Sequence, residues 1–307
     1  MHLTNVGPLW LRRYAVFVAC CSFVLVIAGG LVTSNDAALS VPDWPLSYGR
    51  LVPALEGGIR YEFAHRAMAA LVGLLTLGLA VSLNSTQRRR DAEISAEISA
   101  ENTKAAKTLR TLAWTAVGVV AAQAALGGLT VKLVAPAWAT IAHAALGQVF
   151  FVIIVVICTG LYRGFAPMRG WHLPSVICTV ALFAQTILGA GVRYQVVAPA
   201  AHIGGAILAT VLAMWAGLGL LMQHMDNAAV RRPAVLLLSV TFSQVFLGIG
   251  AMMARVAYLD APQPMPIMVL FTVAHVAVGS LAVGAGVALA MLARPGVFRV
   301  QGGMVTA

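Results

Sequence analysis

The chain has 307 residues, of which 60% are hydrophobic and only 10% are charged. Its mean hydropathy is +0.89, which lies outside the range of soluble globular proteins. The composition therefore excludes a soluble enzyme or binding module, and the formal net charge of +10 needs an explanation within a membrane protein.

Eight apolar stretches are each long enough to cross a bilayer, which takes about 20 helical residues. Continuous apolar runs of this length indicate helices rather than barrel strands, because backbone polar groups in hydrocarbon must bond within the segment. We therefore predict an all-α integral membrane protein with eight transmembrane helices. No cleavable signal peptide is expected, since the first run is itself long enough to span. The predicted spans are 14–33, 63–84, 111–133, 139–162, 174–193, 201–223, 235–254 and 268–291.

The positive charges are distributed unevenly between the connecting segments. If the N-terminus is cytoplasmic, most Lys and Arg residues fall in inner segments. The positive-inside rule then predicts a multi-pass protein of the cell (inner) membrane with both termini in the cytoplasm. Because this asymmetry accounts for the net charge, we expect no nucleic-acid partner.

The eight spans form four hairpins, which we group into two halves. The sequence Val-Ala-Pro-Ala precedes the fourth span at 134–137 and recurs before the sixth at 197–200, which indicates internal duplication. We predict two pseudo-symmetric four-helix bundles with sites between facing helices. The N-terminal half comprises 1–84 and 111–162 with an outer loop at 34–62, residues 85–110 form a cytoplasmic helical linker, and the C-terminal half is 163–307.

The outer loop at 34–62 contains Pro42-Asp-Trp-Pro-Leu46 and a tyrosine at position 48. Long loops within compact domains are typically functional or disordered. The prolines and aromatic residues favour an ordered cap over the N-terminal half.

Four histidines occur at matching places, one near the start of every even-numbered span: His65, His143, His202 and His275. A single intramembrane histidine is more often an interhelical hydrogen-bonding group than a ligand. Four in register favour metal ligation, and a neutral imidazole is a common axial ligand of haem iron. We predict two bis-histidine haem sites, one in each half. The remaining histidines, His2, His172 and His224, are predicted to be solvated.

Glycine clusters end the odd-numbered spans, as in Gln123-Ala-Ala-Leu-Gly127-Gly128. Glycine allows a macrocycle to approach the backbone closely, although small residues also serve ordinary helix packing in membranes. The cysteines have no metal-site spacing and are expected to be buried apolar residues: Cys20, Cys21, Cys158 and Cys178.

Glu62 precedes His65 by three residues, so both share a helix face if the helix has begun. A carboxylate at a membrane boundary is a candidate functional group that could accept a proton or bind an oxygen species. An ion pair with Arg66 or a favourable interaction with the helix dipole explains it equally well.

Three basic residues end odd-numbered spans on the outer side, against the charge bias: Lys132, Arg193 and Arg255. They could bind haem propionates, since ammonium and guanidinium groups suit carboxylates. Snorkelling to the membrane interface is an equally good explanation.

With these residues identified, the chain resembles the haem A synthase family over essentially all eight spans. The resemblance rests on Gly29-Gly-Leu-Val-Thr33, Pro42-Asp-Trp-Pro-Leu46, Glu62-x-x-His65-Arg66 and Leu126-Gly-Gly-Leu-Thr-Val131. His143, His202 and His275 complete the pattern.

The resemblance implies an enzyme that converts haem O to haem A by oxidising a ring methyl group to a formyl group. It assigns Glu62, His65 and His143 to the substrate haem. It assigns His202 and His275 to a haem b that relays electrons. It also implies a role in terminal-oxidase biogenesis, with a haem O synthase as a partner and an unidentified electron donor, while homo-oligomer formation stays open.

One departure concerns the outer loop. Many family members carry a cysteine pair flanking the tryptophan-proline motif, and Val41 and Ser47 occupy the matching positions here. A loop disulfide is therefore absent, and packing must order this loop. Two rival functions remain: a di-haem cytochrome that only transfers electrons, and a transporter, which would not explain four ligands at one depth.

Overall fold

The computed structural model describes residues 7–93, 100–163, 171–258 and 260–293. Regular structure in these ranges is helical, apart from one isolated β-bridge in the outer loop. Each of the eight helices is long and apolar enough to cross a membrane. The predicted all-α architecture with eight membrane-spanning helices is therefore confirmed. The helices are α1 (Leu9–Ser34), α2 (Ile59–Glu93), α3 (Ala100–Lys132), α4 (Ala137–Arg163), α5 (His172–Arg193), α6 (Pro199–His224), α7 (Ala228–Ala257) and α8 (Pro266–Leu292).

Three of the even-numbered helices begin at or directly after a proline. Pro199 and Pro266 occupy the first turn of α6 and α8, and α4 begins after Pro136. Proline suits this position because its fixed φ is helical and the missing N–H would have no partner in the first turn. Both Val-Ala-Pro-Ala sequences therefore lie where a helix begins, two residues before the starts predicted for these spans at 139 and 201.

The predicted linker at 85–110 is helical on both of its described sides. Helix α2 continues to Glu93, and α3 begins at Ala100. The intervening residues 94–99 lie outside the described residues.

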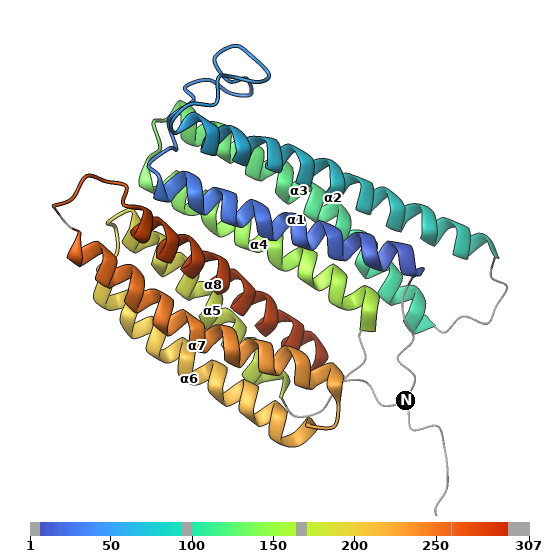
Figure 1. The fold of residues 1–307 in the computed structure, drawn as a ribbon. Helices are drawn as coiled ribbons and strands as arrows, with labels where there is room; N and C mark the ends of the chain where they lie inside the picture. The colour runs from blue at the N-terminus through green and yellow to red at the C-terminus, as the bar shows by residue number, and fades with distance from the viewer. Residues whose placement is uncertain (1–6, 94–99, 164–170, 259, 294–307) are drawn as a thin grey trace, which may run out of the picture.

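The helices pack as two groups of four, α1–α4 and α5–α8 (Figure 1). Within the first group, α1 contacts α2 and α4, and α3 contacts the same two helices. The second group repeats this ring of contacts, so α2 faces α4, and α6 faces α8, diagonally across a ring. The two groups meet along α1, α4, α5 and α8. The pseudo-symmetry between the groups stays a prediction.

We name the two ends of the bundle by their connections. The outer end carries residues 35–58, 133–136, 194–198 and 258–265, and the inner end carries the beginning of α1. The outer loop 35–58 projects beyond the helices at this end (Figure 1).

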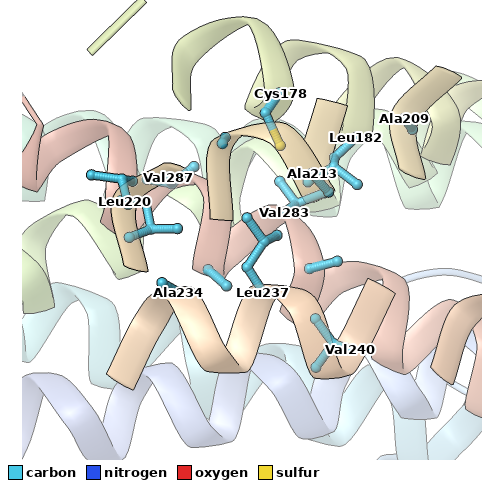
Figure 2. Packing of buried hydrophobic residues seen from close by; sticks show 14 of the residues in the cluster. Cys178, Leu182, Ala209, Ala213, Leu220, Ala234, Leu237, Val240, Val283 and Val287 are labelled. Atoms are coloured by element: carbon cyan, nitrogen blue, oxygen red, sulfur yellow. The ribbon is translucent and has the colours of Figure 1, made fainter. Parts of the chain in front are cut away.

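Apolar side chains fill the inner half of each group. In the first group the cluster includes Leu11, Leu79 and Ile154, all essentially inaccessible. In the second group Leu220 and Leu237 belong to the corresponding cluster (Figure 2). Burial of such side chains holds the helices together at the inner end. The outer halves of the rings are thereby left for the histidines.

Two expectations about single residues were wrong. Cys20 is exposed on α1, and Cys21 and Cys158 are half-buried, so only Cys178 is a buried apolar residue. The other three cysteines lie on α1 and α4, and part of the surface of each of these helices faces outward from the bundle.

His172 and His224, predicted to be solvated, are both half-buried at the inner end. The Nδ1 atom of His172 lies 3.0 Å from the carbonyl oxygen of Ala290, and Nε2 of His224 is buried. His172 thus lies against the end of α8, which the sequence could not place beside it. His2 lies outside the described residues.

Candidate functional site

The histidines of each group face one another across the ring. His65 on α2 and His143 on α4 have ring centroids 6.3 Å apart and planes at 76°. His202 on α6 and His275 on α8 have centroids 6.2 Å apart and planes at 79°. Both pairs thus join the diagonal helices, and they repeat one geometry in the two groups.

A glycine on the preceding helix lies against each imidazole. A Cβ atom on Gly127 would lie 3.1 Å from Cε1 of His143, and one on Gly29 would lie 3.3 Å from Cε1 of His65. Gly189 and Gly248 stand in the same relation to His202 and His275, at 3.1 Å each. A side chain at these positions would push the ring aside. The glycines are therefore needed to seat the imidazoles, which the glycine clusters alone did not reveal.

Three hairpins share a further contact that the sequence reasoning missed. The side-chain amides of Gln123, Gln185 and Gln244 donate hydrogen bonds to the backbone carbonyls of His143, His202 and His275, at 2.7 to 2.8 Å. Each glutamine stands four residues before the glycine that contacts the same histidine. The repeated Gln-x-x-x-Gly spacing was a visible signal for this role. The first hairpin has Leu25 at the matching position.

The imidazoles have one nitrogen available for a ligand. Nδ1 of His65, His143 and His275 is buried without a hydrogen-bond partner, whereas each ring as a whole is only half-buried. The accessible part of these rings therefore includes Nε2. Nδ1 of His202 lies 2.9 Å from the Gln185 amide, which likewise leaves Nε2 accessible.

The ring separation suits one metal ion held between each pair. Two imidazoles on opposite sides of a metal ion, with bonds of about 2 Å, have centroids roughly 6.3 Å apart. In the described part of the chain, no group of three or more His, Cys, Asp or Glu side chains could hold an ion by itself. Two facing imidazoles alone match the axial ligands of a haem, whose macrocycle supplies the other four nitrogens. The residues therefore fit a haem better than a zinc-type site.

Above the first pair, Glu62 and Arg66 fasten the outer loop to α2. Glu62 is 4% exposed, and its Oε2 accepts a hydrogen bond from the backbone N–H of Val41 at 2.8 Å. Its Oε1 pairs with Nη2 of Arg66 at 2.5 Å. Arg66 also donates to the carbonyls of Val41, Asp43 and Leu46 at 3.2, 2.8 and 3.0 Å. The expected ion pair is present, and four of the five donors of Arg66 are used within the protein.

The loop itself is ordered by a tight turn. The Asp43 carboxylate accepts hydrogen bonds from the backbone N–H groups of Tyr48 and Gly49, at 2.6 and 2.8 Å. Both residues of the turn have positive φ, 54° and 67°. The Gly49 N–H and then that of Tyr48 hold the pKa of Asp43 below its ordinary value, because they stabilise the charged form.

Trp44 packs this loop against α3. A Cβ on Gly128 would lie 2.7 Å from Cδ2 of the Trp44 indole, so the ring rests on α3 beside Gly127, and Gly127 contacts His143. The loop is therefore ordered by contacts with α2 and α3, and its role as a cap over the first histidine pair stays a prediction.

The three outer basic residues have different surroundings. Nη2 of Arg193 donates to the backbone oxygen of Thr33 at 2.6 Å and to the Asp36 carboxylate at 2.8 Å, which joins α5 to the end of α1. Lys132 and Arg255 are exposed at the outer ends of α3 and α7. Neither of these two forms an ion pair with another described residue.

Comparison with known proteins gives a consistent set of relatives. No family model matches the chain. It is 30% identical over 173 residues to a protein named heme A synthase from Methylobacterium radiotolerans, which covers 52% of this chain and 42% of the relative. Over that part of its length, the chain is similar to the haem A synthases. Similar proteins of that name occur in Exiguobacterium sibiricum, with 36% identity over 93 residues (28% of this chain, 31% of the relative), and in Methylobacterium sp. strain 4-46, with 29% identity over 151 residues (45% and 37%).

The aligned part spans less than half the length of each of these haem A synthases. The family resemblance inferred from the motifs is confirmed. The structure adds the diagonal pairing of the histidines, the glycines that lie against their rings, and the Glu62–Arg66 fastening of the outer loop.

Proposed function

We propose that this protein oxidises a methyl group of haem O to a formyl group, giving haem A for terminal oxidases. The observation that carries the proposal is an asymmetry between two similar sites. Both groups contain a diagonal histidine pair with the same separation. Among the described residues, a buried carboxylate occurs beside the first pair, where Glu62 precedes His65 by three residues and binds the outer loop.

The proposed assignment follows from this asymmetry. His65 and His143 would hold the substrate haem O, and His202 and His275 would hold a haem b. With dioxygen as the oxidant and an external donor supplying two electrons for each dioxygen consumed, two successive hydroxylations of the methyl group and loss of water give the formyl group. The haem b would relay those electrons to the first site. The protein contributes binding, orientation and electrostatics. The cap shields the first site from water at the outer end.

Glu62 has a place in this proposal as a proton acceptor beside the substrate. Its two oxygens already contact the Val41 N–H and Arg66, but a carboxylate has further lone pairs. It can therefore accept a proton without leaving Arg66. The same contacts hold the outer loop in place, so removal of the Glu62 carboxylate would affect both proton transfer and the position of the loop.

Charged groups at the outer end complete the proposed sites. Lys132 and Arg255 are exposed and can reach haem propionates, while Arg193 would have to share its guanidinium with Asp36. Arg66 has one donor left for such a contact. We place the protein in the cell membrane with both termini in the cytoplasm, where lipophilic haem O could arrive from the bilayer or from a haem O synthase.

A di-haem cytochrome that only transfers electrons is the second candidate. The near-identical geometry of the two pairs favours it, because two bis-histidine haems are all that such a carrier requires. It would give no role to the buried Glu62 carboxylate beside the first pair.

The deciding experiment uses membranes of a host that makes haem O but no haem A, with and without this chain. Extraction and chromatography should show haem A, or a hydroxylated form of haem O, only when the chain is expressed. Bound haem b with unchanged haem O, despite a competent electron supply, would favour the cytochrome. A His65→Ala variant should stop haem A formation and keep most haem b, whereas His202→Ala should lose haem b.

A further inference from the structure

A buried side-chain hydrogen bond joins the two groups inside the membrane-spanning region. Nε2 of Gln148 on α4 donates to Oγ of Ser280 on α8 at 2.7 Å. Both residues are buried, with 8% and 0% of their surface exposed. At the outer end, Arg193 also joins the groups through its hydrogen bonds to Thr33 and Asp36.

The two partners occupy matching positions in the two groups. Gln148 follows His143 by five residues on α4, and Ser280 follows His275 by five residues on α8. With a rise of about 1.5 Å per residue, each lies about 7.5 Å along its helix from the histidine. The hydrogen bond therefore joins α4 and α8 at equal distances from one histidine of each site. While it is intact, the two histidines are held at the same depth.

The surroundings make this contact directional and hard to replace. Ser280 Oγ donates its own proton to the carbonyl oxygen of Val276 at 3.0 Å, so it is free to accept from Gln148. One helical turn further in, Gly284 of α8 packs against Phe151 of α4, where a Cβ would lie 3.4 Å from the ring. That apolar contact would allow α4 to slide along α8, because van der Waals contacts do not depend on direction. A buried hydrogen bond, by contrast, is broken by a shift of a few ångströms.

We propose that Gln148 and Ser280 are positioning residues that fix the register of α4 against α8, and thereby the separation between the two haem sites. The inference rests on the proposed function, in which the haem b of the second group passes electrons one at a time to the site in the first group. In each passage the donor iron loses the electron that the acceptor iron gains. A shift of α4 along α8 would move one site relative to the other without removing a ligand.

The test uses purified full-length protein titrated with haem b, and measures the distance between the two ferric irons by pulsed electron paramagnetic resonance. Wild-type protein should bind two equivalents and give one narrow distance. Gln148→Leu and Ser280→Ala should keep both haems but broaden or shift that distance. In the haem O host, the rate of haem A formation per bound haem should fall several-fold. Ser22→Ala is the matched control, because Ser22 is a buried serine that bonds only the carbonyl four residues earlier, Val18.

A reciprocal exchange guards against a general folding defect. Because the positions match, the double variant Gln148→Ser, Ser280→Gln should restore the hydrogen bond and the narrow distance. An unchanged distance in both single variants, or a broadened one in Ser22→Ala, would overturn the positioning role and leave the proposed function intact. Wild-type protein that binds fewer than two haems would overturn the two-site assignment itself.

Discussion

Replacing Arg66 by methionine is expected to release the outer loop from α2. The guanidinium donates to the carbonyls of Val41, Asp43 and Leu46 and pairs with Glu62. Methionine keeps much of the length and none of the donors. The variant leaves the Glu62 carboxylate buried without its cation.

The magnitude follows from these contacts. Removing one partner of a buried ion pair costs about 3–5 kcal/mol, and Glu62 is 4% exposed. Hydrogen bonds from a charged donor contribute about 1.5–3 kcal/mol each, but the freed carbonyls regain water once the loop lifts. We therefore expect a loss of about 3–5 kcal/mol in loop docking. The double variant Glu62→Gln, Arg66→Met should lose less, because no uncompensated charge remains.

Hydrogen exchange of the amides of residues 41–50, followed by mass spectrometry, measures this loss directly. Exchange in Arg66→Met should rise by a factor on the order of a hundred or more, since local opening sets the rate. Arg60→Met is the control, because Arg60 lies in the first turn of α2, is exposed, and contacts the ring and hydroxyl of Tyr61 rather than the outer loop. An exchange rate in Arg66→Met equal to that of the wild type, or an equal rise in Arg60→Met, would refute the proposal that Arg66 fastens the outer loop to α2.

Two further predictions concern the second site and the loop turn. Gly189→Ala should displace His202, because the new Cβ would lie 3.1 Å from Cε1, and should lower the haem b content of the purified protein. Gly204→Ala is the control, because its Cβ would meet nothing within 4 Å, and it should leave the haem b content unchanged. Equal haem b contents in the two variants would contradict the role of Gly189. For Asp43, the lowered folded-state pKa means that its contribution is complete above the unfolded value of about 3.9 and is lost only as pH falls through the folded value. The hydrogen-exchange protection of the loop amides, corrected for intrinsic exchange, should therefore stay constant between about pH 8 and pH 5 in the wild type and be low at every pH in Asp43→Ala. A loss of protection in the wild type within that pH range would contradict the role of Asp43 in the turn.

The sequence was sufficient to predict the histidine pairs and an ordered outer loop, but not the side chains that position them. The even spacing of His65, His143, His202 and His275 among the spans predicted one pair per half, and the rings do face each other in those pairs. The glutamines that bind the histidine carbonyls occur in a repeated Gln-x-x-x-Gly pattern. The sequence does not show which carbonyl an amide side chain binds, because that depends on how the helices pack. Cys20 was misplaced because a helix in a bilayer offers apolar residues an outward face as well as a core.

The sequence by itself determined the number and helical nature of the spans, because about 20 consecutive apolar residues have few alternatives in hydrocarbon. Prolines also mark the starts of α4, α6 and α8 in the sequence. Only the tertiary structure decided that Arg66 reaches back to the carbonyls of the loop and that Gln148 meets Ser280, 132 residues later. Span formation depends on local composition summed along one segment, whereas these contacts depend on which faces of separate helices pack together, and that is fixed by the whole bundle at once.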